Sequence, residues 1–152
     1  MAASTGFPAA DKRPPGEVRR PAHCRVLVVD DSPTMRSELS NVLAAGGFEV
    51  AGCAVDGLEG VRRYQDLRPD VVLMDVTMPF LDGIEATRRI RGIDPDARVV
   101  VICGPCSPDQ AREALAVGAV ACAKRPLDHR RLLERVAAAM RNDERSMEGS
   151  CP

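Results

Sequence analysis

Three aspartates that follow apolar segments carry the clearest chemistry in the sequence. Asp30 and Asp31 come directly after the apolar run 25–29, and Asp75 comes directly after the run 70–74. Carboxylates that are held together repel one another, so they coexist only when one is protonated or a cation lies among them. A group of carboxylate oxygens with open positions suits Mg2+. One such aspartate alone would be an ordinary solvated side chain, but the three together predict a divalent metal site.

The segments that would position these aspartates form a unit that occurs five times. In each unit, a short apolar run typical of a buried strand precedes a stretch whose apolar residues have helical spacing. In the first unit, Ser32 and Pro33 suit the start of a helix, and Gly46-Gly47 end it. The expected strands are 25–29, 48–55, 70–74, 98–102 and 119–124, and the later helices are 58–67, 84–91, 108–117 and 128–140.

Strands that alternate with helices predict an α/β fold, a doubly wound parallel sheet with helices on both faces. Ligands of such sheets bind outside the carboxyl ends of the strands, where the strand order reverses. In a strand order of 2-1-3-4-5 the first and third strands are neighbours. Asp30, Asp31 and Asp75 would then converge at one edge of the sheet.

The composition indicates one domain with polar ends. The chain has 152 residues, of which 45% are hydrophobic, and this is enough for a core of ordinary size. Residues 1–22 and 141–152 carry charges and prolines without hydrophobic periodicity. Such segments do not bury enough apolar surface to offset the entropy lost on ordering. We expect both segments to be disordered, and we expect one domain from 24 to 140.

The charge and hydropathy of the chain exclude several kinds of partner. Its 21 basic and 22 acidic residues give a formal net charge of -1, which provides no basic field for DNA or anionic lipid. The N-terminus lacks the apolar stretch of a signal peptide, and no apolar run is as long as a membrane span. We expect a cytoplasmic protein that binds neither nucleic acid nor membrane.

The expected domain contains the motifs Val-Val-Asp30-Asp31-Ser-Pro-Thr-Met-Arg, Val-Leu-Met-Asp75-Val-Thr-Met-Pro79-Phe-Leu-Asp-Gly83, Gly118-Ala119, and a basic residue before Pro126. In these motifs the chain resembles the receiver domains of bacterial two-component response regulators, and its first motif is most similar to the receivers of chemotaxis proteins. The resemblance covers the whole expected domain. It implies a flavodoxin-like fold with five parallel strands in the order 2-1-3-4-5.

The resemblance also implies roles for the acidic residues. Asp75 would accept the phosphoryl group, Asp31, Asp75 and the backbone carbonyl of Thr77 would bind Mg2+, and Asp30 would help through water. The partners implied are a sensor histidine kinase or phosphotransfer protein and a downstream protein target. We expect the target to dock on the face made by the fourth and fifth units. The protein would be a stand-alone signalling receiver that promotes only its own phosphorylation and dephosphorylation, and not otherwise an enzyme.

Three positions depart from the family pattern. Cys103 stands where receivers carry a serine or threonine whose hydroxyl donates to the phosphoryl group, and a thiol is a weak donor. Cys122 stands where an aromatic residue is usual. Arg125 replaces the lysine before the proline, and Lys124 could serve instead if the local register shifts. The sequence therefore predicts an intact acceptor site with an altered switch.

A redox function is the alternative. The sequence Cys103-Gly104-Pro105-Cys106 is identical to the motif of thioredoxins, although Ile102 stands where they carry tryptophan. A degenerate or redox-modulated receiver that uses this dithiol remains an open hypothesis. Zinc binding by these cysteines would need two more ligands, from Cys122 and from His129 or His23. A haloacid-dehalogenase-like phosphatase would need an aspartate at Thr77, and a dinucleotide site would need a glycine-rich turn after the first strand.

Overall fold

A computed structural model describes residues 24–104 and 108–141 of the chain. The five strands form one parallel sheet in the order β2-β1-β3-β4-β5, which confirms the predicted doubly wound fold. The strands are β1 (Arg25–Val29), β2 (Glu49–Ala54), β3 (Val71–Asp75), β4 (Val99–Cys103) and β5 (Ala121–Lys124). The segments expected to be disordered, apart from Arg141, lie outside the described residues, as does Cys106.

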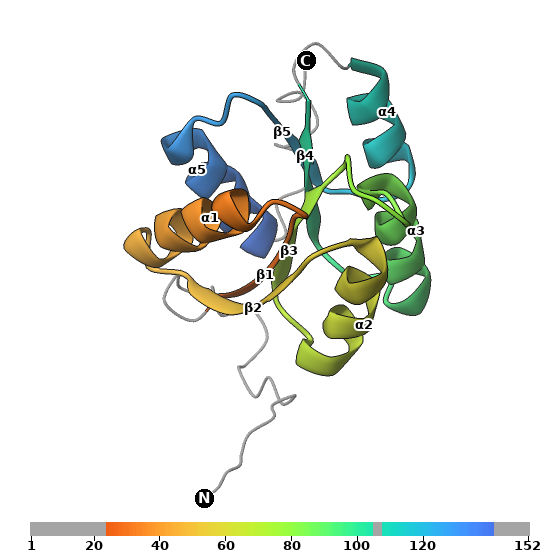
Figure 1. Ribbon diagram of the computed structural model, residues 1–152, viewed down its shortest axis with the longest axis horizontal. Coiled ribbons are helices and arrows are strands. Elements are labelled where there is room, and N and C mark those ends of the chain that lie inside the picture. Colours follow the sequence, from red (N-terminus) through yellow and green to blue (C-terminus); the bar gives the residue numbers. More distant parts are fainter. Residues whose placement is uncertain (1–23, 105–107, 142–152) are drawn as a thin grey trace, which may run out of the picture.

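Five helices cover the two faces of the sheet. They are α1 (Pro33–Ala45), α2 (Gly57–Leu67), α3 (Gly83–Ile93), α4 (Pro108–Ala116) and α5 (His129–Met140). Helices α1 and α5 lie on one face, and α2, α3 and α4 lie on the other (Figure 1). Within the described parts of the chain, every helix is too short or too polar to cross a membrane.

The sheet separates two hydrophobic cores, because successive side chains of a strand point to opposite faces. Leu73 of β3 packs in the core beneath α1 and α5, together with Leu39 and Leu132. Its neighbour Met74 packs in the core beneath α2, α3 and α4, together with Ile90. All residues of β3 and β4 are buried, as expected for central strands that are covered on both faces.

Side-chain caps set the starts of the helices. The side chains of Ser32, Asp56, Asp82 and Asp128 each accept a hydrogen bond from the backbone amide three residues later. The predicted helices and strands are all present, with ends that differ by at most two residues. Asp75 was expected after the third strand and is instead its last residue, since the adjoining Val76 N–H still bonds the carbonyl of Ile102.

The turn between β3 and α3 is packed tightly against the end of β3. A Cβ atom on Gly83 would overlap the backbone carbonyl oxygen of Asp75. The Gly83 amide also donates to the carbonyl of Val76 at 2.8 Å. Only glycine allows this approach of α3 to the strand that carries Asp75.

We predict that Gly83→Ala destabilises the protein by about 1–3 kcal/mol, because the added methyl group must displace backbone atoms. Gly92→Ala is the matched control, because a Cβ there meets no atom within 4 Å. Gly92 lies in the same helix, and its replacement by alanine should stabilise the protein by about 0.5–1 kcal/mol. Urea unfolding followed by circular dichroism measures both changes, and equal midpoints for the two variants would contradict the packing described.

Candidate phosphoacceptor and metal site

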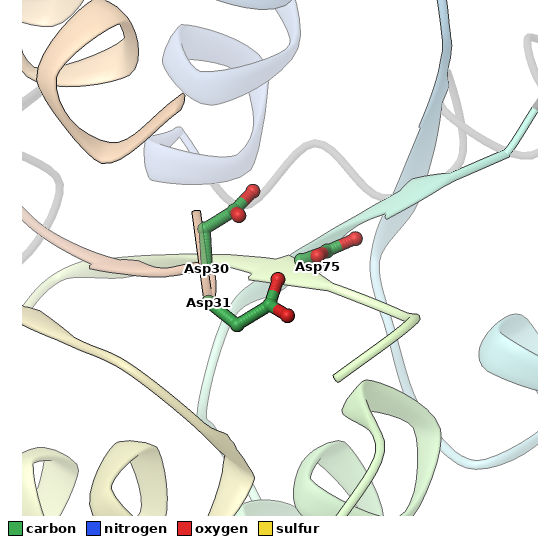
Figure 2. A group of neighbouring side chains, drawn as sticks. All are labelled: Asp30, Asp31 and Asp75. Carbon is green, nitrogen blue, oxygen red and sulfur yellow. The ribbon is translucent and has the colours of Figure 1, made fainter. Parts of the chain in front are cut away.

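The three predicted aspartates meet at the carboxyl edge of the sheet. Strand β1 pairs with β3, and Val29 is opposite Met74, so the residues that follow Val29 lie beside Asp75. Carboxylate oxygens of Asp30, Asp31 and Asp75 all lie within 4.8 Å of one another. Figure 2 shows the three side chains at the ends of these neighbouring strands. Asp30 and Asp75 are 1% and 6% exposed, whereas Asp31 is exposed, so the site opens to solvent on the Asp31 side.

Local hydrogen bonds fix Asp30 in this position. Its Oδ1 accepts from the Ser32 amide at 2.9 Å, and Arg36 Nη1 donates to its carbonyl oxygen at 2.8 Å. The Asp30 amide donates to the carbonyl of Ala54 at the end of β2. The sequence does not predict the contact from Arg36, because this contact depends on the direction that α1 takes after β1.

Arg125 supplies the cation of the site. Its Nη2 lies 3.1 Å from Asp75 Oδ1 and 3.4 Å from Asp30 Oδ2. The sequence left open whether Arg125 or Lys124 would face the acidic residues. In the structure Arg125 makes this contact, while Lys124 is the last residue of β5. One guanidinium nitrogen makes both contacts, because it carries two N–H donors.

The pKa of Asp75 is raised above its ordinary value of 3.8. Burial is the main cause, and the charge of Asp30 adds to it. The hydrogen bond and the charge of Arg125 oppose the shift, as does the Thr77 backbone amide. One guanidinium group therefore does not compensate the carboxylates fully. A hard cation with oxygen ligands would complete the compensation, and the donor set of three carboxylates fits Mg2+.

Two thiols lie next to the acidic site. Cys103 ends β4 and Cys122 lies in β5, and both are buried in the core on the α4 side of the sheet. The Cys122 thiol donates to the carbonyl of Ala111 in α4 at 3.6 Å. A hydrogen bond with Cys122 lowers the pKa of Cys103; burial opposes this shift, and the charge of Lys124 adds to it. The second cysteine of the predicted dithiol, Cys106, lies outside the described residues.

The fold and the acidic site are those of a receiver domain. Residues 26–137 match the family of response regulator receiver domains, and the chain belongs to this family. It is of the chemotaxis type, and it is 39% identical over 144 residues to the chemotaxis protein CheY of Treponema pallidum. This match covers 93% of the present chain and 100% of that protein.

Two further matches show the range of the family. A chain in the crystal structure of the CheX-CheY-BeF3-Mg+2 complex from Borrelia burgdorferi is 34% identical, with a TM-score of 0.71. The match covers 76% of the present chain and 87% of that chain. Protein-glutamate methylesterase/protein-glutamine glutaminase 5 of Myxococcus xanthus is 41% identical over 104 residues. That match covers 67% of this chain but 30% of the enzyme, so the same unit also occurs within longer proteins.

We predict that Asp75→Asn stabilises the Mg2+-free protein near neutral pH. Because the folded pKa of Asp75 is above 3.8, the folded state binds more protons than the unfolded state between the two values. The free energy of unfolding therefore falls as the pH rises through that window. The amide of Asp75→Asn does not titrate, so the variant avoids this loss. We expect Tm to rise by about 2–4 °C, which corresponds to about 1 kcal/mol in a domain of this size.

Thermal unfolding in chelator at several pH values measures this effect. The gain in Tm of Asp75→Asn over the wild type should shrink as the pH falls toward the ordinary pKa range of a carboxyl group. Asp109→Asn is the control, because Asp109 lies in an exposed ion pair on α4 and should leave Tm unchanged. A lower Tm for Asp75→Asn near neutral pH would contradict the prediction.

Proposed function

We propose that this protein is a single-domain response regulator that accepts a phosphoryl group on Asp75. The donor is a sensor histidine kinase or a phosphotransfer protein, and the reaction depends on Mg2+. The observation that supports this best is the convergence of three carboxylates within 4.8 Å, with Arg125 in contact with two of them. Phosphoryl transfer needs a positioned nucleophile and compensation of charge on the phosphoryl oxygens, and these residues supply both.

The metal would be held by Asp31, Asp75 and the backbone carbonyl of Thr77, with Asp30 acting through water. Oxygen ligands with positions left for water and phosphate are typical of Mg2+ sites. The bound ion would compensate charge on the phosphoryl oxygens. The exposure of Asp31 and Thr77 leaves this side of the site accessible.

The protein groups carry out the transfer in one displacement. An ionised oxygen of Asp75 attacks the phosphorus in line with the leaving group, so a bond to the Asp75 oxygen forms as the bond to the donor nitrogen breaks. Arg125 Nη2 already bonds Asp75 and Asp30, and the other N–H groups of its guanidinium would contact the phosphoryl oxygens. Water then attacks the phosphorus of the acyl phosphate, so the bond to Asp75 breaks, inorganic phosphate leaves and the Asp75 carboxylate is regenerated.

The output would be binding of a downstream protein rather than catalysis. We propose that phosphorylation biases the face formed by α4, β5 and α5, because Cys103, Arg125 and Cys122 link the acceptor site to these elements. The protein would act in the cytoplasm, without nucleic acid or membrane as a partner.

We predict that the protein gains one phosphoryl group when incubated with Mg2+ and acetyl phosphate. Intact-protein mass spectrometry measures the gain. Asp75→Asn and addition of chelator should abolish it, because the nucleophile or the metal is then missing. Asp109→Asn should be labelled like the wild type. Equal labelling of Asp75→Asn would show that another residue is the acceptor.

We also predict that Cys103→Thr strengthens the structural response to phosphorylation. A hydroxyl donates to a charged acceptor better than a thiol does, and such a bond is worth about 1.5–3 kcal/mol. For amides of α4 and β5, the ratio of exchange rates between the unphosphorylated and phosphorylated forms should therefore be about tenfold larger in Cys103→Thr than in the wild type.

Cys53→Thr is the control for this experiment, because it makes the same exchange in β2 and contacts Ser40 rather than the acceptor site. It should respond to phosphorylation like the wild type. An unchanged response in Cys103→Thr would mean that residue 103 does not couple the site to α4 and β5.

A further inference from the structure

Two thiols that are neither nucleophile nor metal ligand in the proposed phosphoryl transfer lie buried side by side. Cys103 and Cys122 are 0% and 1% exposed, and both belong to the hydrophobic core beneath α2, α3 and α4. They come from the neighbouring strands β4 and β5, and a hydrogen bond joins their side chains. A single buried cysteine is usually inert, but two thiols in contact can serve together as ligands of one ion.

The register of the two strands argues against a disulfide between these thiols. Cys122 is opposite Val101 and Cys103 is opposite Lys124, so the two cysteines are offset by two residues along the strands. With about 3.3 Å per residue and about 4.8 Å between strands, their Cα atoms are roughly 8 Å apart. A disulfide needs a Cα separation below about 7 Å. The two sulfur atoms can therefore bond directly only if the backbone moves.

One ion between the two sulfur atoms fits this spacing better. Each metal–thiolate bond is about 2.3 Å long, so an ion held between two thiolates keeps the sulfur atoms about 4–5 Å apart. Other hydrogen bonds of sulfur in this molecule span 3.6 Å, from Cys122 to Ala111, and 3.8 Å, between Ser40 and Cys53. The hydrogen-bonded pair is thus close to the spacing that a bridging ion requires, and only the side chains need to adjust.

The ligand set selects the kind of ion. Zn2+ takes four ligands, and among the described residues the three aspartates are the only group of three or more potential metal ligands. His129, which the sequence offered as a further zinc ligand, instead lies 3.1 Å from Glu38 of α1, on the other face of the sheet (Figure 1). Two soft thiolates suit Cu(I), whereas Mg2+ prefers oxygen ligands. The thiol pair and the acidic site would therefore bind different metals.

The charge of a copper site at this position is partly compensated. Two thiolates and one Cu(I) ion leave one net negative charge in the core. Lys124 is opposite Cys103 in the sheet and provides a positive charge. The pKa of the Cys103 thiol is lowered, mainly by the hydrogen bond with Cys122 and also by the charge of Lys124, while burial and the charge of Asp75 oppose this shift.

We propose that Cys103 and Cys122 form a binding site for one Cu(I) ion. On binding, two sulfur–copper bonds form, two S–H bonds break and both protons go to solvent, with no change in oxidation state. The ion replaces the proton that Cys122 shares with the carbonyl of Ala111, so the contact between β5 and α4 changes. The site gives the protein a response to Cu(I) that does not depend on phosphorylation of Asp75.

Competition with the Cu(I) chelator bicinchoninate, under anaerobic conditions, tests the proposal on the reduced protein. Bleaching of the coloured chelator complex measures the transfer of copper, and native mass spectrometry counts the ions bound. The variants at the site are Cys103→Ser and Cys122→Ala. Cys53→Ser is the matched control, because it removes a half-buried thiol from β2. A second control, Cys106→Ser/Cys151→Ser, removes two thiols that lie outside the described residues.

We expect the wild type to bind one Cu(I) ion, and Cys103→Ser and Cys122→Ala to bind it at least about 100-fold more weakly. Loss of a ligand costs more than loss of a residue that only orients a ligand. Both controls should bind copper like the wild type, and millimolar Mg2+ should not displace it. No uptake by the wild type, or an equal loss of affinity in either control, would overturn the proposal.

Two further measurements do not depend on how well the variants fold. X-ray absorption at the copper edge should show two sulfur neighbours; a third sulfur, or nitrogen or oxygen ligands, would overturn the two-thiolate site. Amide hydrogen exchange in α4 of the wild type should change when Cu(I) is added, because the bond from Cys122 to Ala111 is lost. Identical exchange with and without Cu(I) would overturn the link between the ion and α4.

Discussion

The repulsion among three carboxylates at one edge of the sheet is the constraint on which the site depends. Parallel strands end side by side, and the order in which β1 lies next to β3 brings Asp30, Asp31 and Asp75 together. Burial strengthens the repulsion, because charges interact more strongly where water is excluded. Arg125 compensates part of it, and a divalent cation would compensate the rest. The fold thus holds an arrangement that is unfavourable by itself and that cations make favourable.

The sequence was sufficient to predict the architecture, because β1, β3 and β4 are short runs rich in β-branched residues and because strands alternate with segments of helical periodicity. It was also sufficient to bring the three aspartates together once the strand order was assumed. It could not choose between Arg125 and Lys124, since a shift of one residue at the end of β5 exchanges their directions. It could not reveal the exposure of Phe80 either, because a phenylalanine with positive φ has no local sequence signal.

The two cysteines would change how the site communicates with the rest of the sheet. A hydroxyl at the end of β4 and a mobile aromatic side chain in β5 would act through directed hydrogen bonds and a change of rotamer. Cys103 and Cys122 are instead small, buried, and in contact with one another and with α4. Any coupling through them must rely mainly on packing, and close-packed interiors transmit even small displacements of volume.

The division of the interior by the sheet has a consequence for how the protein can diversify. Side chains beneath α1 and α5 share no core with those beneath α2, α3 and α4. Effects of substitutions at distant sites without shared partners are close to additive. Each face can therefore accumulate changes without compensation on the other. The two layers of helices are therefore independent of each other. Surfaces on opposite faces of the sheet can evolve new specificities separately while the strands between them stay the same.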